Sequence, residues 1–354
     1  MINSQIPFNK LPLLEVRLAE WSSDTDHGML EAIRAMDYLN GFLEGFDDDL
    51  SRYYLSNLQY TEIRNSLELE GYPVAINRIF EAENSENALQ DDVLAGIIDY
   101  HSSIKSGKQL GLEVLRPTSF RSLMKQADQF RERKEQSIKS YFTNLTLYTA
   151  PSQTAVLNQL RRNLDAFISE GSVFRQLHVV SLVHYQLRAI GPFNHFNGLS
   201  ARTLFLQALQ AYGLQASTLP VSSELLRQRE RYQTLMRDSI QSGDLGDWHK
   251  FMAEIIVRAC RKLLTQLKQM AKLKKQLVEQ IGKYTDYNMP VELALTLMQQ
   301  PYIKVIDLVS ELRCHRQTAA TYLKHLVKMG ILVEKRSGRE KLYLNKELMD
   351  ILSN

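Results

Sequence analysis

The spacing of hydrophobic residues predicts a mainly helical protein. Apolar side chains recur every three or four residues, which places them on one face of a helix. A different pattern at residues 141–151, rich in Thr, Tyr and Phe, favours a short hairpin or flap. The predicted helices are residues 29–40, 50–69, 75–83, 89–105, 121–133, 156–169, 177–190, 199–212 and 247–282.

The last part of the chain has a pattern of its own. Breaker residues at 284–290 indicate a linker. Three helical segments then precede two β-type segments that flank Ser337 and Gly338. This order predicts an α+β winged helix-turn-helix. The predicted segments are helices at 291–300, 306–312 and 317–329 and strands at 331–333 and 341–344.

Composition limits the class of protein without identifying it. The 354 residues are 44% hydrophobic and 23% charged, which is typical of a globular protein of two or three domains. The net charge of +3 means that any basic patch must be local. The two cysteines, Cys260 and Cys314, form no disulfide framework, and no segment resembles a signal peptide or a membrane span. We therefore expect a cytoplasmic protein with no membrane partner.

The stretch from Gly191 to Arg202 lies between two apolar helical segments and opens the second of them. The start of a helix attracts anions, because its N–H groups are unpaired and its dipole is positive there. This stretch resembles the signature HPFxxGNGRxxR of the Fic (filamentation-induced-by-cAMP) family. With the segments around it, the resemblance extends over residues 50–262. It implies a helical bundle core with a small β-hairpin flap, and transfer of AMP from ATP to a hydroxyl of a target protein.

The signature departs from the family at the positions that perform chemistry. In the family, a histidine is the general base, an acidic residue binds magnesium, and the rest holds the phosphates. Here the histidine position is Gly191 and the acidic position is His195. Glycine cannot accept a proton, and imidazole is a poor ligand for magnesium. We expect no intact catalytic residue, no metal ligand and no ordinary AMP transfer, while Asn197, Gly198 and Arg202 remain as nucleotide- or anion-binding candidates.

Two further features resemble the family. Residues Ser66, Glu70 and Gly71 fit its inhibitory motif, (S/T)xxxE(G/N). The resemblance implies that Glu70 pairs with Arg202 and blocks a phosphate site, as charge-assisted pairing allows. The alternative is that Glu70 is an acidic surface residue at a helix end. The flap resembles the hairpin that holds target proteins, and its candidate residues are Tyr148, Thr149 and Pro151.

The C-terminal segment carries a local excess of positive charge. Between Arg313 and Lys341, eight basic residues face two acidic ones. Such a patch on a winged helix favours contact with duplex DNA, although these modules also serve in protein interaction or dimerisation. The DNA-binding candidates are Arg316, Gln317, Thr318 and Thr321 on the third helix and Lys335, Arg336 and Arg339 at the wing.

Together these patterns predict three regions: residues 1–110 with the inhibitory motif, 111–283 with the Fic-like core and a long helix, and 284–354 with the winged helix. The leading hypothesis is a regulatory or binding protein derived from a Fic enzyme. The second is an active transferase with altered chemistry, in which His195 or a partner supplies the base. The third is a DNA-binding regulator whose core is a dimerisation scaffold. ATP and magnesium are implied by the resemblance alone, and the sequence is compatible with a homodimer.

Overall fold

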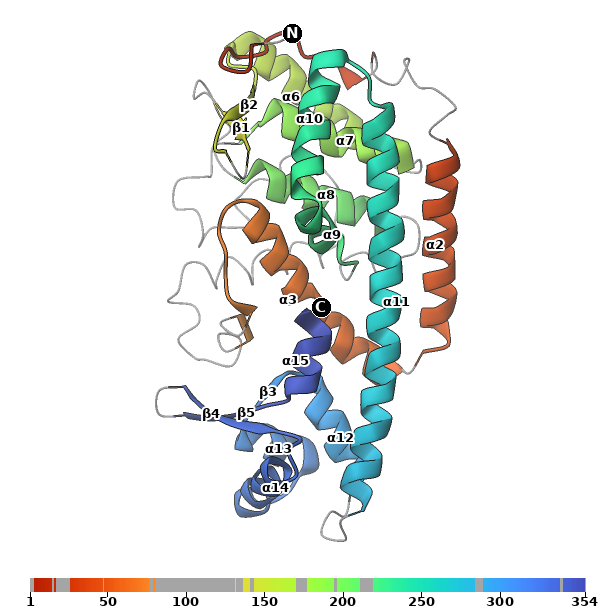
Figure 1. The fold of residues 1–354 in the computed structure, drawn as a ribbon, viewed down its shortest axis with the longest axis vertical. Coiled ribbons are helices and arrows are strands. Elements are labelled where there is room, and N and C mark those ends of the chain that lie inside the picture. Colours follow the sequence, from red (N-terminus) through yellow and green to blue (C-terminus); the bar gives the residue numbers. More distant parts are fainter. Residues whose placement is uncertain are drawn as a thin grey trace.

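The computed structural model of the chain is mainly helical, as the sequence predicts (Figure 1). The structure describes residues 3–14, 16, 26–46, 48–76, 79–80, 131, 136–140, 143–169, 177–193, 196–210, 219–283, 289–337 and 340–353. Of the predicted helices, residues 89–105 and most of 75–83 and 121–133 lie outside these ranges. No helix in the described part of the chain is long and apolar enough to cross a membrane.

Helices and one small hairpin make up the larger part of the fold. The long helix α11 runs along the molecule and packs against α2, α7, α9 and α10 (Figure 1). The elements are α2 (Asp26–Glu44), α3 (Asp48–Leu69), β1 (Ser137–Lys139), β2 (Thr146–Thr149), α6 (Thr154–Ser169), α7 (Leu177–Ile190), α8 (Asn197–Gln210), α9 (Val221–Arg227), α10 (Arg229–Ser242) and α11 (Gly246–Gly282).

Helix α7 lies at the centre of the core. It ends where the Gly191–Arg202 stretch begins, and we call the part of that stretch before α8 the motif loop. Twelve of its fourteen residues are buried, because other elements cover nearly every face. Tyr185 of α7, Tyr232 of α10 and Trp248 and Phe251 of α11 form an aromatic cluster with ring centroids 5.7–6.4 Å apart. Aromatic packing of this kind fixes the helix that positions the loop.

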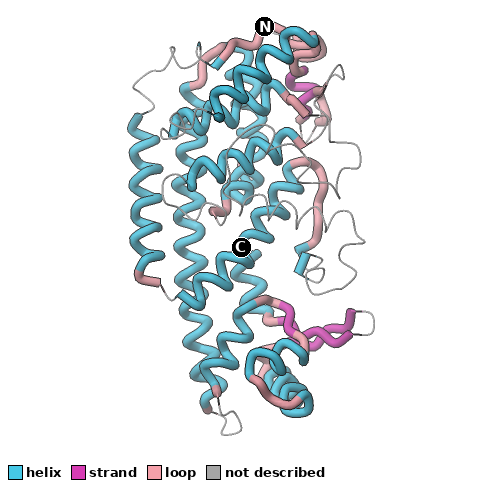
Figure 2. The backbone as a smooth tube through the Cα atoms, turned by 180° about the vertical axis from the view of Figure 1, so that it is seen from behind, coloured by secondary structure: helices cyan, strands magenta, loops and turns pink. Residues whose placement is uncertain are grey.

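The C-terminal module, α12–α15 with β3–β5, has the predicted order of three helices followed by a hairpin. Its three strands form an antiparallel sheet in the order β3-β5-β4, on one side of the module (Figure 2). Helices α12 and α15 pack against both α3 and α11. The elements are α12 (Pro290–Gln299), β3 (Tyr302–Ile303), α13 (Val305–Leu312), α14 (Arg316–Lys328), β4 (Val333–Ser337), β5 (Glu340–Leu344) and α15 (Lys346–Ser353).

Three predictions of local structure need correction. The strand predicted at 331–333 begins at Val333, because the N–H groups of Ile331 and Leu332 bond back to the carbonyl of Leu326 and close the preceding helix. The flap begins earlier than predicted, since its first strand is β1. Arg131, predicted to be helical, lies outside any helix, because its N–H bonds to the carbonyl of Pro192 and not to a helical neighbour.

Candidate functional site

A buried arginine fixes the loop that joins α7 to α8. The guanidinium of Arg131 is 1% exposed and donates to the carbonyl oxygens of Gly191, Ile190 and Pro151 at 2.8, 2.9 and 2.7 Å. Burial lowers the pKa of Arg131 from its ordinary value. The three bonds tie the motif loop to the end of the flap. Sequence reasoning missed this residue, because an arginine in a charged segment carries no sign of burial.

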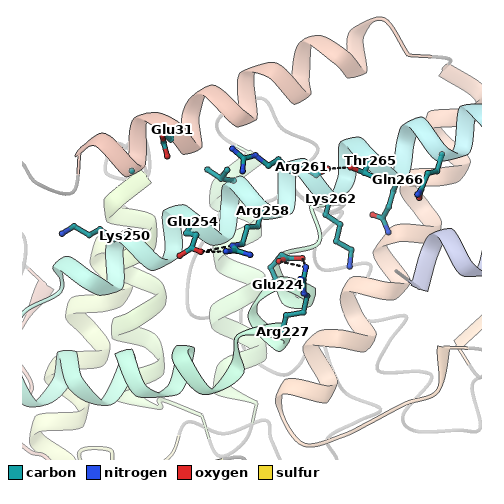
Figure 3. A pocket seen from close by; sticks show the side chains of 13 residues that line it. Glu31, Glu224, Arg227, Lys250, Glu254, Arg258, Arg261, Lys262, Thr265 and Gln266 are labelled. Atoms are coloured by element: carbon teal, nitrogen blue, oxygen red, sulfur yellow. Dashed lines mark hydrogen bonds and ion pairs between the residues drawn. The ribbon is translucent and has the colours of Figure 1, made fainter.

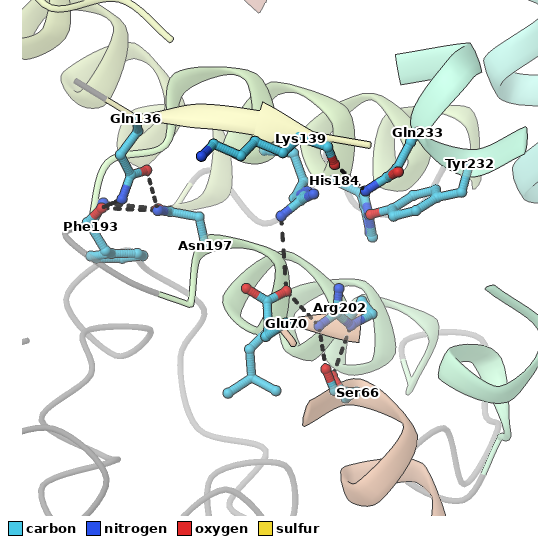
Figure 4. Close-up of polar contacts among 12 residues, drawn as sticks. Ser66, Glu70, Gln136, Lys139, His184, Phe193, Asn197, Arg202, Tyr232 and Gln233 are labelled. Carbon is cyan, nitrogen blue, oxygen red and sulfur yellow. Dashed lines mark hydrogen bonds and ion pairs between the residues drawn. The ribbon is translucent and has the colours of Figure 1, made fainter. Parts of the chain in front are cut away.

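The space beside Gly191, where the family has its catalytic histidine, is filled by Gln136. A Cβ on Gly191 would lie 2.7 Å from Oε1 of Gln136, and the φ of Gly191 is +55°. The Gln136 amide donates to the carbonyl of Phe193 at 2.8 Å and accepts from Nδ2 of Asn197 at 2.7 Å (Figure 4). An amide that is bonded on both sides holds this position and offers no proton acceptor equivalent to imidazole.

Asn197, predicted to bind nucleotide, is engaged within its own loop. Its Nδ2 also donates to the carbonyl of Phe193 at 2.9 Å, and its Oδ1 accepts from the N–H of Phe193 at 2.9 Å. These bonds close the turn that leads into α8. The side chain therefore stabilises the loop and is not directed at open space.

Glu70 and Arg202 form the predicted ion pair. Nη2 of Arg202 lies 2.8 Å from Oε1 of Glu70, and the two side chains are 1% and 11% exposed. The same guanidinium donates from Nε to the hydroxyl of Ser66 and from Nη2 to its carbonyl, both at 2.8 Å (Figure 4). Two residues of the inhibitory motif thus hold Arg202. The alternative that Glu70 is a surface acid is wrong, because α3 directs its end into the core.

Gly71 makes this geometry possible. Its φ is +86°, a conformation that ends a helix and that glycine adopts without strain. The N–H groups of Gly71 and Tyr72 bond back to the carbonyls of Glu68 and Leu67, which ends α3 at Leu69, just before Glu70.

The Glu70 carboxylate occupies the start of α8. A Cβ on Gly198, in the first turn of α8, would overlap Oε1 of Glu70. Arg188 on α7 adds a second guanidinium, with its Nη1 3.9 Å from the same oxygen. A carboxylate between two arginines at a helix N-terminus fills the place where this geometry would otherwise favour a phosphate. We call Ser66, Glu70, Arg188 and Arg202 the arginine site. Arg188 was missed as a member, although its basic side chain in an apolar helix was a visible signal.

Two buried titratable groups lie beneath the arginine site. Glu62 of α3 accepts the N–H of Ser222 at 2.9 and 3.0 Å, and burial raises its pKa to about 7. His184 of α7 bonds through Nε2 to the hydroxyl of Tyr232 at 2.7 Å. Burial and then the charges of Arg202 and Arg188 lower the pKa of His184 well below its ordinary value, so it is a neutral core histidine.

The other altered motif positions are apolar and buried. Phe196 has a φ of +56° and packs on Tyr72 with ring centroids 5.0 Å apart. Leu199, at the position of the family's first motif arginine, is 1% exposed. His195 lies outside the described residues.

Neither a metal-binding cluster nor an unengaged phosphate-binding side chain is found among the described residues of this site. Among the described residues, no group of three or more His, Cys, Asp or Glu side chains could hold a metal ion. The retained phosphate ligands, Asn197 and Arg202, are bonded to Gln136, Phe193, Ser66 and Glu70.

The flap does not present its predicted target-binding residues to solvent. Tyr148 is 2% exposed and donates its hydroxyl to the carbonyl of Ala189 at 2.9 Å. Burial raises the pKa of Tyr148 well above its ordinary value. Thr149 and Pro151 are also buried. Ser4 and Phe8 bond to Thr149 at the outer edge of β2, and target binding by the flap residues stays a prediction.

The DNA-binding candidates lie on the surface of the C-terminal module. Arg316, Gln317 and Thr321 are exposed on α14, and Thr318 is half-buried. Lys335 and Arg336 are exposed on β4, while Arg339 lies outside the described residues. The structure thus brings the described candidates to one module, far along the chain from the arginine site.

A separate groove of about 680 Å³ lies between α2, α9 and α11 (Figure 3). Two of its three acidic residues pair with arginines, since Glu254 lies 2.7 Å from Arg258 and Glu224 lies 3.2 Å from Arg227. No residue of the Fic-like motif lines it.

Comparison with known proteins agrees with the sequence motifs. Residues 264–348 match the family model described as "Protein adenylyltransferase SoFic-like, C-terminal domain". The fold is similar to the crystal structure of a Fic family protein from Desulfovibrio desulfuricans, with a TM-score of 0.55 and 15% identity over 90% of this chain and 95% of that chain. The fold is therefore that of a Fic-like helical protein. The family-model match covers the C-terminal part of the chain, and the structural match concerns the fold.

Proposed function

We propose that this chain is a degenerate Fic-domain protein without ordinary AMP transfer, acting as a regulatory or binding protein. The main support is the pair Gly191 and Gln136. The position that needs a general base has no side chain, and a hydrogen-bonded amide fills the space beside it. A general base typically contributes about 10²–10⁴-fold to rate, so its replacement removes an essential part of the reaction.

The arginine site gives the proposal a regulatory element. Arg188 and Arg202 converge on one carboxylate at the start of α8, and that carboxylate belongs to the inhibitory motif. If Glu70 left, two guanidinium groups and a helix N-terminus would face the same point. That arrangement suits a phosphate group, so Glu70 is a lock on an anion site.

Calorimetry with ATP and magnesium tests the lock. We expect wild type to bind no nucleotide and Glu70→Gly to bind it, because the variant frees both arginines. Glu68→Gly is the matched control. It makes the same substitution two residues earlier, at a partly exposed carboxylate that contacts Arg64. The control should behave as wild type.

The outcomes separate the hypotheses. If Glu70→Gly binds ATP but no AMP appears on protein, the site is a sensor. AMP transfer by this variant would contradict the proposal and favour the altered transferase, whose base would come from His195 or a partner. If neither protein binds nucleotide, the lock is wrong and the C-terminal module becomes the functional part.

The C-terminal module supports a second function, binding of duplex DNA as a winged helix. Its support is the exposed α14 surface of Arg316, Gln317 and Thr321 beside the exposed Lys335 and Arg336 of β4. Side chains on the first half of a recognition helix read bases, and those on a wing contact phosphates.

Titration of labelled duplex DNA tests this second function. Arg316→Ala should weaken binding by about 1–3 kcal/mol if it contacts a base. Lys250→Ala, an exposed lysine near the opposite end of α11, is the control. Equal binding by wild type and Arg316→Ala would count against readout by α14 and favour a protein-interaction or dimerisation module.

A further inference from the structure

A second hollow lies beside the groove of Figure 3, along the line where α2 meets α11. Its volume is about 420 Å³, and it shares Glu31, Val257 and Arg261 with the groove. Because they share these residues, the two hollows form one continuous surface. We call the α2 and α11 residues that line them, within 28–39 and 250–269, the α2–α11 surface.

The smaller hollow has an apolar lining and an exposed aromatic side chain. Ala35 and Leu39 of α2 line it together with Val257 and Leu264 of α11. Tyr38 belongs to the same lining and is 63% exposed. An apolar hollow with an exposed ring beside it is typical of a contact that receives an apolar side chain of a partner.

Two arginines border this apolar lining. Arg34 on α2 and Arg261 on α11 are both exposed, and neither forms an ion pair within the part of the chain that the structure describes. Glu31, the acidic residue of the same hollow, lies 3.6 Å from His27. The two guanidinium groups are therefore free to pair with carboxylates of a partner.

The larger groove continues the excess of positive charge but mixes it with negative charge. Five basic and three acidic residues line it. Its Gln266 is 4% exposed and donates from Nε2 to the carbonyl of Ile351 at 2.9 Å, while its Oε1 accepts from no described residue. The mixture of signs disfavours a nucleic acid, whose phosphates form an unbroken line of negative charge. It suits a peptide whose carboxylates are separated.

The walls of the surface are helices, which limits the form of the partner. The backbone groups of α2 and α11 bond within their own helices, so neither wall offers a strand edge. An extended peptide would leave water without new partners for its backbone. A helical peptide satisfies its own backbone and binds through one face.

We propose that the α2–α11 surface docks an acidic amphipathic helix of a partner protein. An apolar side chain of that helix enters the smaller hollow, and its carboxylates pair with Arg34 and Arg261. Arginine and tyrosine are the residues that most often carry binding energy at interfaces. The surface contains no residue of the motif loop, the flap or the C-terminal module, so the inference is independent of nucleotide and DNA binding.

The test uses the full chain and a labelled helical peptide of leucine, alanine and glutamate, with leucines at i, i+3 and i+7. Wild type should bind it, as measured by fluorescence anisotropy. Arg261→Glu should weaken binding at least about 10-fold, because it sets a carboxylate against the carboxylates of the peptide. Lys272→Glu is the matched control and should bind as wild type does. It makes the same kind of charge reversal about three turns further along α11, outside both hollows.

An exchange of charges distinguishes docking from misfolding. The double variant Arg34→Glu/Arg261→Glu should bind a peptide that has lysine in place of glutamate, and wild type should not. An unfolded protein cannot exchange its preference in this way.

Five results would overturn the proposal. The first two are failure of wild type to bind the glutamate peptide and equal affinity of wild type and Arg261→Glu for it. The third is undiminished binding of a peptide with serine in place of leucine, which would indicate attraction of charge alone. The fourth is tighter binding of single-stranded oligothymidylate than of the peptide, which would indicate a nucleic-acid site. The fifth is dimerisation of wild type that Arg261→Glu abolishes, seen by sedimentation, which would mean that a second copy occupies the surface.

Discussion

The arginine site and the C-terminal module use positive charge in opposite ways. Arg202 is 1% exposed and bonded to Ser66 of α3 and to Glu70, which follows that helix. Arg316, Lys335 and Arg336 are exposed on the C-terminal module and make no ion pair with any described residue. The first cation is satisfied inside the fold, and the others remain available to a partner. The comparison shows that Arg202 is used within the fold, while the three cations of the module are exposed to solvent.

A second comparison is between the motif loop and the flap. Gln136 and Asn197 complete each other's hydrogen bonds, and residues 4–9 complete the edge of β2. Both satisfy groups that would otherwise bind a ligand. Gln136 lies beside the motif loop, whereas residues 4–9 lie at the surface, where they bond to the outer edge of the flap.

The largest effect is expected from Arg202→Ala. The change leaves the Glu70 carboxylate, 11% exposed, without its nearest guanidinium, and it leaves the Ser66 hydroxyl and carbonyl without their donor. Breaking a buried pair from one side costs about 3–5 kcal/mol. Urea denaturation should show a loss of this size in the free energy of unfolding.

Arg237→Ala is the control for that experiment. Its pair with Asp238 lies at the surface, where such pairs contribute about 0–1 kcal/mol. If the free energy of unfolding fell no more for Arg202→Ala than for Arg237→Ala, the arginine site would contribute little to stability. The contrast between a buried, paired Arg202 and the exposed cations of the module would then fail.

The second effect is a pH dependence of stability that originates in the core. Glu62 is buried against Ser222 and faces the charges of Arg202 and Lys262, and its folded pKa is about 7. Because that value lies above the unfolded one, the folded state binds the proton more tightly. Its contribution to stability is full at low pH and is lost as pH rises from the unfolded pKa through about 7.

The variant Glu62→Gln isolates this contribution. From pH 5 to pH 8, wild type should lose about 2 kcal/mol of unfolding free energy relative to the variant. Other groups titrate alike in both proteins and cancel in the difference. Parallel stability curves for the two proteins would show that Glu62 does not titrate in this range.

The sequence predicted helices more reliably than it predicted the site. The 177–190 helix agrees to the residue, because its apolar pattern is continuous. Helices α9 and α10 were missed, since residues 221–242 are rich in Arg and Gln and show a weak apolar face. Helix α15 was missed although its buried Leu348 and Leu352 are spaced four residues apart.

For the site, the motif predicted the Glu70–Arg202 contact. It did not reveal which residues hold the loop and fill the position of the missing catalytic histidine. The Glu70–Arg202 pair is confirmed because two charges of opposite sign had matching motif positions. Gln136 and Arg131 bind loop carbonyls, and backbone carbonyls leave no mark in a sequence. Coverage of the flap by residues 4–9 is likewise a backbone contact that no side-chain pattern reveals.

A third prediction concerns the closed space beside Gly191. Gly191→Ala places a methyl group 2.7 Å from Oε1 of Gln136 at a φ of +55°. A non-glycine residue in this conformation costs about 1–2 kcal/mol before the collision is counted. Thermal unfolding should show this loss, and Gln136→Ala in the same chain should recover part of it. Gly282→Ala, with no atom within 4 Å of the new carbon and at the end of a helix, should not destabilise the protein.

The smallest effect is expected for the exposed cations of β4. It tests whether the positive charge of the C-terminal module binds DNA. Lys335 and Arg336 stand exposed on β4, and in DNA binding each would neutralise one phosphate. Lys335→Ala should therefore weaken duplex binding alike for all sequences and reduce the slope of log K against log salt by about 1. Lys250→Ala should leave the slope unchanged, because that lysine lies near the far end of α11. A slope that is the same in all three proteins would mean that the exposed charge of β4 serves a partner other than nucleic acid.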